Sequence, residues 1–154
     1  TDVIVNNFAQ TLIAGIQSNI RTKRVTEFGS MNASGTMADS LKYKWDGKKL
    51  VIFSTEKYFT VLETGRGPGK RPPMSTIEKW LEDKPVAVQE ISKKSLAYLI
   101  ARKIGVEGSK LFRQGGNSGV ISDYINEKYV TDNLTEKLFQ AQIEIITNQF
   151  LQNT

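Results

Sequence analysis

The stretch that decides the fold is YFTVLETGRGPGKRPPMSTIEKWL, residues Tyr58 to Leu81. It begins with apolar residues at helical spacing and then breaks on three alternate glycines, Gly65, Gly67 and Gly69. Proline fixes φ and disfavours the helical region for the residue before it, so Pro72-Pro73 predicts the entrance to a new helix. The stretch therefore predicts two short helices joined by a rigid connection, residues 65–73, which we call the elbow.

Both helices beside the elbow show end signals. Gly65 can supply a left-handed C-cap to the first helix. Ser75 and Glu78 have the spacing of a capping box, in which a hydroxyl and a carboxylate satisfy free backbone N–H groups at a helix start. Trp80 lies on the apolar stripe of this second helix, so we predict that it belongs to the core.

The glycines and three cations of the elbow (Arg66, Lys70, Arg71) raise the question of a phosphate-binding loop. A Walker-type loop ending at Gly69-Lys70 needs glycine at position 64 and Ser or Thr at 71, where the chain has Thr64 and Arg71. The dinucleotide pattern needs a small residue where Lys70 stands. Both motifs fail, which leaves a generic anion-binding loop or, as for most such segments, a connector.

The composition indicates one globular domain spanning residues 1–154, with 39% hydrophobic and 24% charged residues. The chain has no cysteine and no histidine, the commonest general base and metal ligand. We therefore expect no enzymatic activity, no cofactor and no bound metal. No apolar run approaches the roughly 18 residues of a membrane span and no signal peptide opens the sequence, so we expect no membrane association.

The net charge of +5 is concentrated in one segment. Residues 65–113 contain 11 Lys or Arg and 5 Asp or Glu, a net of +6, whereas the other residues contain 10 and 11, a net of −1. Such a segment suits a polyanion or an acidic partner. A solvated face of mixed charge is the more common explanation.

Before the elbow, the sequence predicts a helix and a β-hairpin. Apolar spacing predicts a helix from Asp2 to Arg21, and the Gly-, Ser- and Asn-rich residues Phe28 to Leu41 predict turns. Alternation predicts antiparallel pairing of residues 41–45 with 50–54, and Asp46-Gly47 predicts a type I′ turn between them. The lysines on its wet face suit nucleic-acid contact or, more commonly, edge protection; they are Lys42, Lys44, Lys48 and Lys49.

After the elbow, the sequence predicts several helices and a flexible loop. Beyond the helix that contains Trp80, the next predicted helix spans Ser92 to Ile104 and stops at Gly105 or Gly108. It carries the apolar stripe Leu96, Leu99, Ile100 and Ile104. Residues 114–119 (QGGNSG) predict a flexible loop, and residues Val120 to Tyr129 a weaker helix.

The last predicted helix covers residues 132–151 and follows a turn at residues 131–133. Asn133 and Glu136 have the spacing of a second capping box. The helix has two apolar stripes: Leu134, Leu138, Ala141 and Ile145 form one, and Phe139, Ile143, Ile146 and Phe150 form the other. Two stripes indicate either contact with another subunit or wide burial in the chain's own core. The predicted class is α+β: an N-terminal helix, a small antiparallel hairpin-based sheet and several packed helices.

Two segments, SGTMADSL (residues 34–41) and YFTVLETGRGPG (residues 58–69), together resemble the tail-completion, or neck, proteins of tailed bacteriophages. In that family a Thr/Ser-Gly-x-Leu-x-x-Ser element precedes strands and a Tyr-x-x-hydrophobic-hydrophobic-Glu-x-Gly element. The matching residues here are Ser34, Gly35, Met37 in place of leucine, Ser40, Tyr58, Val61, Leu62, Glu63 and Gly65. The resemblance covers roughly residues 34–108, and the elbow replaces the family's usual Pro-Phe-Leu tail.

The resemblance implies a structural virion protein of the head–tail connector, made in the host cytoplasm. Copies would form a homo-oligomeric ring that contacts portal-adaptor and tail proteins, near genomic DNA. Nothing in the family pattern is catalytic, and we expect Tyr58 and Glu63 to make local structural bonds. We expect subunit or lumen contacts from Arg66, Lys70 and Arg71, and from the second stripe of the last helix. The alternative is a basic nucleic-acid-binding module that uses residues 65–113.

Overall fold

The chain is organised on a long N-terminal helix, α1 (Asp2–Thr22), which its apolar spacing predicts correctly. One face of α1 supplies much of the main core: Val5, Phe8, Ala9, Leu12, Ile16 and Ile20. The structure is a computed structural model that describes residues 1–25, 31, 34–84 and 90–152. Within these ranges, helices accompany one two-stranded antiparallel sheet, which confirms the predicted α+β class.

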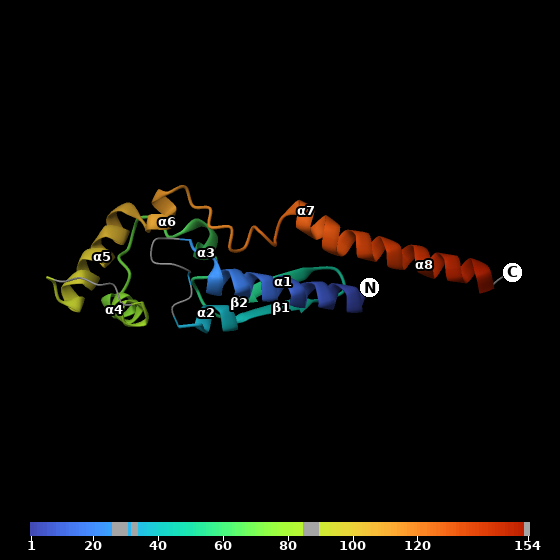
Figure 1. Ribbon diagram of the computed structural model, residues 1–154, viewed down its shortest axis with the longest axis horizontal. Helices are drawn as coiled ribbons and strands as arrows, with labels where there is room; N and C mark the ends of the chain where they lie inside the picture. Colours follow the sequence, from blue (N-terminus) through green and yellow to red (C-terminus); the bar gives the residue numbers. More distant parts are fainter. Residues whose placement is uncertain (26–30, 32–33, 85–89, 153–154) are drawn as a thin grey trace.

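The molecule is elongated (Figure 1). Helices α4 (Met74–Asp83) and α5 (Lys93–Glu107) lie at one end, and α8 (Glu136–Gln152) projects from the other. The main core lies between them, where α1 packs against the hairpin.

The β-hairpin consists of β1 (Leu41–Trp45) and β2 (Leu50–Ser54), paired in the predicted register with Trp45 opposite Leu50. Leu41 and Ile52 face the main core with α1. The opposite face is exposed and carries Lys42, Lys44, Val51 and Phe53.

The connection between the strands is not the predicted type I′ turn, which needs a positive φ at both Asp46 and Gly47. Four residues, 46–49, join the strands, and only Gly47 among them has a positive φ, +89°. Asp46 Oδ1 accepts hydrogen bonds from the backbone N–H groups of Lys48 (2.9 Å) and Lys49 (2.8 Å). These bonds hold the pKa of Asp46 below its ordinary value. The turn is therefore stabilised by the Asp46 side chain.

A short helix, α2 (Thr36–Asp39), lies within the segment for which the sequence predicted turns. It follows Gly35, whose φ is +86°, and buries Ala38 beside α1. The turns predicted for residues 28–30 and 32–33 lie outside the described residues.

Two short helices flank the elbow, as predicted: α3 (Val61–Thr64) and α4. Gly65 ends α3 with φ +75° and an extended ψ of 174°, so the position needs glycine although it is not a left-handed helical cap. The predicted Ser75–Glu78 capping box is wrong. Pro73 stands at the N-cap without a side-chain hydrogen bond, and Ser75 already lies inside the helix, so proline's fixed φ sets the entrance.

Helices α4 and α5 form a second apolar cluster, apart from the main core. Its buried members are Ile77, Leu81, Ala97 and Ala101. Trp80 packs against this cluster, as predicted, although it is only partly buried. Helix α5 starts after Ser92, whose Oγ accepts a hydrogen bond from the Ser95 N–H, and it continues through Gly105 to end at Gly108. Leu99, predicted on the buried stripe, is 48% exposed.

The C-terminal helix is continuous with the one before it. Helix α7 (Glu127–Val130) passes into a π-helical turn, η1 (Thr131–Thr135), and then into α8. The predicted turn at residues 131–133 and the Asn133–Glu136 capping box are therefore wrong. Asn133 Nδ2 instead donates to the Tyr129 carbonyl oxygen at 2.9 Å, one turn earlier.

Candidate functional site

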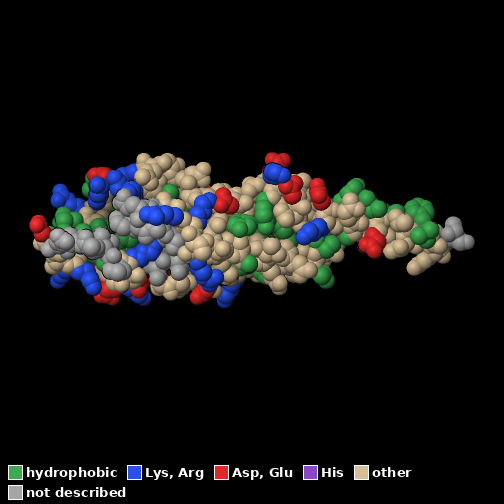
Figure 2. Space-filling view, viewed as in Figure 1, with side chains coloured by type: hydrophobic (Ala, Val, Ile, Leu, Met, Phe, Trp, Pro, Cys, Tyr) green, Lys and Arg blue, Asp and Glu red, His purple; other side chains and the backbone are tan. Residues whose placement is uncertain are grey.

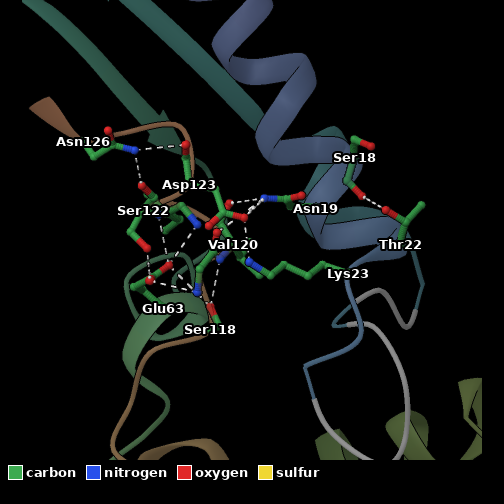
Figure 3. Close-up of polar contacts among 12 residues, drawn as sticks. Ser18, Asn19, Thr22, Lys23, Glu63, Ser118, Val120, Ser122, Asp123 and Asn126 are labelled. Carbon is green, nitrogen blue, oxygen red and sulfur yellow. Dashed lines mark hydrogen bonds and ion pairs between the residues drawn. The ribbon is translucent and has the colours of Figure 1, made fainter. Parts of the chain in front are cut away.

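The carboxylate of Glu63 holds the turn at residues 118–123 against α3 (Figure 3). Oε1 accepts hydrogen bonds from the Gly119 N–H (3.0 Å) and the Ser122 hydroxyl (2.6 Å). Oε2 accepts from the backbone N–H groups of Ile121 (2.9 Å) and Ser122 (3.3 Å). We call Glu63 and this turn the Glu63 latch. The bonds to Glu63 join residues 55 to 59 positions apart, so they are not local ones.

The electrostatics of the latch favour the ionised carboxylate. Burial acts to raise the pKa of Glu63, but hydrogen bonds from the Ser122 side chain and from the backbone of Ile121, Ser122 and Gly119 outweigh it. The pKa therefore lies below its ordinary value. The ionised carboxylate therefore holds the turn at residues 118–123 by hydrogen bonds.

The latch turn is also tied to α1 (Figure 3). Asn19 Nδ2 donates to the Val120 carbonyl oxygen at 3.3 Å, and Lys23 Nζ lies 2.6 Å from Asp123 Oδ2. The side chain of Val120 is fully buried in the main core. Residues 120–126 form turns and bends, so of the helix predicted from Val120 to Tyr129 only residues 127–129 are helical, in α7 (Glu127–Val130).

The preceding loop, residues 114–119, was predicted from its composition to be flexible. In the structure it ends on buried residues, and Ser118 Oγ donates to the Leu62 carbonyl oxygen at 2.7 Å. The backbone N–H of Ser118 donates to the Glu63 carbonyl oxygen at 3.0 Å. The end of the loop is therefore fixed to α3 by hydrogen bonds from Ser118, which is the first residue of the latch turn.

The elbow packs closely against the end of α5 and the start of α6 (Lys110–Arg113). The Gly69 N–H donates to the Gly105 carbonyl oxygen at 2.8 Å, and the Ser109 N–H donates to the Arg66 carbonyl oxygen at 2.7 Å. A Cβ on Gly65 would lie 2.5 Å from the Phe112 backbone nitrogen. The glycines therefore permit a close backbone contact, and the elbow is a packed joint between the main core and the second cluster.

The three cations of the elbow are not equivalent. The guanidinium of Arg66 donates to the Lys70 carbonyl oxygen at 2.6 Å and so braces the elbow itself. Arg71 is exposed and its guanidinium carbon lies 5.7 Å from the centre of the Tyr98 ring, a cation–π contact. The Lys70 side chain is also exposed. Of the predicted contact residues, Lys70 and Arg71 are thus the outward ones.

Helix α8 has no buried residue in its described length. In the stripe predicted to contact another subunit, Phe139 is 64%, Ile143 43%, Ile146 44% and Phe150 73% exposed. Burial in the chain's own core, the other interpretation of the two stripes, is therefore not what the structure shows. We call Phe139, Ile143 and Ile146, which lie at i, i+4 and i+7, the α8 apolar face. Figure 2 shows hydrophobic side chains along this end of the molecule.

The residues of the resemblance lie in two places, around α2 and the hairpin and at the end of α3. Ser40 Oγ donates to the Met37 carbonyl oxygen at 2.7 Å and lies 2.6 Å from Ser54 Oγ of β2. Ser34 Oγ lies 2.9 Å from Thr36 Oγ1, beside the positive-φ Gly35. Tyr58 is 47% exposed, so of the two residues expected to make structural bonds only Glu63 is a centre of them.

Within the described ranges, no cluster of three His, Cys, Asp or Glu residues could hold a metal ion. In the same ranges, none of the helices has both the length and the apolarity that crossing a membrane requires. Comparisons of the chain with protein-family models, curated proteins and solved structures found no match.

Sequence reasoning missed a second exposed apolar surface, on α5. Leu99 (48%), Val106 (67%) and Tyr98 (45%) are exposed there. The available signal was the seven-residue spacing of Leu99 and Val106, which places them on one side of a helix, away from Ala97 and Ala101.

Proposed function

We propose that the protein is a structural subunit of the head–tail junction of a tailed bacteriophage, where copies form a ring that contacts portal-adaptor and tail proteins. The observation that carries this proposal is the exposed α8 apolar face. Large apolar side chains gathered on one projecting helix mark a surface that another protein covers. In a subunit of a larger assembly, a neighbouring subunit would cover this surface.

The structural roles of the motif residues support the link to the neck-protein family. Gly35 and Gly65 adopt positive φ values, which favour glycine strongly. Ser40 bridges α2 and β2, and Glu63 organises the latch. The spacing that resembles the family therefore falls on positions where the backbone and the hydrogen bonds require these residue types.

The packed elbow supports the same proposal. A preformed joint loses less conformational entropy on docking than a loose one. Its outward cations, Lys70 and Arg71, are available to carboxylates of a neighbouring subunit, and arginine pairs with carboxylates by two hydrogen bonds. Arg66 contributes by holding the elbow in shape.

The test is the oligomeric state of the wild-type chain and of a variant with Phe139→Gln and Ile143→Gln, measured by native mass spectrometry and particle imaging. We expect a closed ring of one stoichiometry from the wild type and folded monomers from the variant, because both substitutions remove exposed apolar area. The matched control is Val3→Gln with Ile125→Gln, two exposed positions outside α8, which should leave the ring intact. A wild-type chain that stays monomeric up to its solubility limit would overturn the proposal.

The nucleic-acid-binding alternative is favoured by the +6 net charge of residues 65–113. Figure 2 shows Lys and Arg side chains gathered toward the α4 and α5 end. The same samples should therefore be titrated with duplex DNA at several salt concentrations. Salt-sensitive DNA binding by a chain that does not assemble would favour the nucleic-acid-binding module.

A further inference from the structure

Two exposed apolar surfaces lie at opposite ends of this elongated molecule. One is the α8 apolar face, and the other is on α5, at the far end (Figure 1). On α5, residues 99, 102, 103 and 106 lie at i, i+3, i+4 and i+7, so they share one side of the helix. We call this side, made of Leu99, Arg102, Lys103 and Val106, the α5 outer face.

The α5 outer face combines apolar and basic side chains. Leu99 and Val106 are 48% and 67% exposed, and Arg102 and Lys103 beside them are exposed too. The buried residues Ala97 and Ala101 lie on the other side of the helix, against α4. The second apolar cluster therefore contains the opposite side of α5, and the α5 outer face takes no part in it.

The charges at the two ends are opposite in sign. Residues 127–152 contain 4 Asp or Glu and 2 Lys or Arg, a net of −2, whereas residues 65–113 have a net of +6. Glu136 precedes Phe139 by three positions and so flanks the α8 apolar face. An apolar face flanked by a carboxylate complements an apolar face flanked by Arg102 and Lys103.

We propose that the α8 apolar face of one copy docks on the α5 outer face of the next copy, so that copies join head to tail. This inference rests on the proposed function, in which α8 is an assembly surface, and it names the surface that receives α8. A contact between two different surfaces is heterologous, and it closes into a ring when the rotation between copies permits. The packed elbow fixes the position of α5 relative to the main core, which keeps that rotation the same in every copy.

The exposed apolar area provides more than half of what such a contact needs. The exposed parts of Phe139, Ile143 and Ile146, together with those of Leu99 and Val106, sum to roughly 500 Å². A standard interface of about 1,600 Å² contains about 900 Å² of apolar area, so these five side chains provide more than half of it. Pairing of α8 with α8 of another copy would instead bring together two helices of net −1 (2 Glu and 1 Lys each) and leave the α5 outer face uncovered.

The test uses two complementary variants with neutral substitutions. The α8 variant carries Phe139→Gln and Ile143→Gln, and the α5 variant carries Leu99→Gln and Val106→Gln. All four positions are exposed, and circular dichroism should show that both variants fold. Each variant keeps one of the two surfaces intact. The matched control is again Val3→Gln with Ile125→Gln.

In sedimentation velocity, we expect each variant alone to be monomeric, with association weakened at least tenfold relative to the wild type. An equimolar mixture should form a 1:1 complex and nothing larger, because only one intact pair of surfaces remains. The control variant should assemble as the wild type does.

An α5 variant that still assembles, or a mixture that forms no complex, would overturn the head-to-tail contact while leaving the proposed assembly role standing. A wild-type chain that never assembles would overturn both. The two failures are thus distinguished by the behaviour of the wild type.

Discussion

Replacing Glu63 by glutamine tests whether the latch holds the fold together. The substitution keeps the size of the side chain and one carbonyl oxygen, but it replaces the other oxygen by an NH₂ group. That NH₂ group meets backbone N–H groups that are donors like itself, because the carboxylate accepts from the N–H groups of Gly119, Ile121 and Ser122 as well as from the hydroxyls of Ser118 and Ser122. At least two of these donors therefore lose their acceptor.

The expected cost follows from those lost bonds. If the glutamine oxygen takes the place of Oε1, the bonds from Gly119 and the Ser122 hydroxyl survive, and the Ile121 N–H (2.9 Å) and Ser122 N–H (3.3 Å) lose theirs. An unsatisfied donor costs about 1–3 kcal/mol, and the longer bond contributes at the low end. We expect Glu63→Gln to lower the free energy of unfolding by about 2–4 kcal/mol.

The assay is urea denaturation at pH 7, followed by circular dichroism, at concentrations where the variant and the wild type have the same oligomeric state. Glu90→Gln is the matched control, because Glu90 is exposed, and we expect it to change stability by less than about 0.5 kcal/mol. A Glu63→Gln variant as stable as the control would refute the assignment of Glu63 as the residue that fastens the turn.

The pH dependence gives a second measure of the same contact. The pKa of Glu63 is lowered in the folded chain from its ordinary value of 4.5. A depressed folded pKa means that the ionised group contributes stability above the unfolded pKa and loses it as the pH falls through the folded pKa. The stability gap between the wild type and Glu63→Gln should therefore be full at pH 7 and shrink progressively below pH 4.5. A gap that stays constant into acid would show that the charge contributes nothing.

Three further substitutions probe the turn, the second cluster and the elbow by chemical denaturation. Gly47→Val should cost about 1 kcal/mol or more, because Gly47 has φ +89° with open space around it, and Gly47→Asn should cost less. Trp80→Ala should cost about 2–3 kcal/mol, less than for a fully buried tryptophan, since Trp80 is only partly buried, and its fluorescence should be only partly quenched by iodide. Gly65→Ala should cost more than about 2 kcal/mol, since its Cβ would meet backbone at 2.5 Å, whereas Gly67→Ala, with ordinary contacts at 3.4 Å, should be tolerated.

Periodicity predicted the elements whose burial is one-sided. Helix α1 and the two strands have the expected bounds because one face of each is buried and the other exposed, which imposes a period on the sequence. The predicted register of the hairpin held for the same reason, since a shift of one residue would exchange its two faces.

End signals were less reliable, because several local arrangements satisfy the same backbone groups. Ser75 has a capping hydroxyl, but the N-cap of α4 is Pro73, two residues earlier, so the hydroxyl is not needed. Asn133 also has capping chemistry, yet its side chain donates to the Tyr129 carbonyl oxygen and the helix continues through a π-helical turn. Composition specifies which groups are present at these positions and leaves their partners open.

The candidate site was only partly predictable, because its contacts join distant segments. Glu63 stood out as a motif residue, but its partners lie more than 50 positions away and are mostly backbone N–H groups, which leave no mark on a sequence. The stripe containing Phe139 and Ile143 was visible from spacing. Whether it lay inside or outside depended on where the rest of the chain packs, which one sequence does not determine.

The distribution of rigidity in this chain is itself an argument for assembly over ligand binding. The Glu63 latch joins α1, α3 and the residues leading to α7, and the elbow joins the main core to α4 and α5 through close glycine contacts. Both joints lie between the two exposed apolar surfaces and fix the path from one to the other. A protein that gripped a polyanion by charge alone would gain little from such fixed geometry, because phosphate attraction depends weakly on backbone detail. A subunit repeated around a ring needs it, because a small error in the rotation between copies prevents closure.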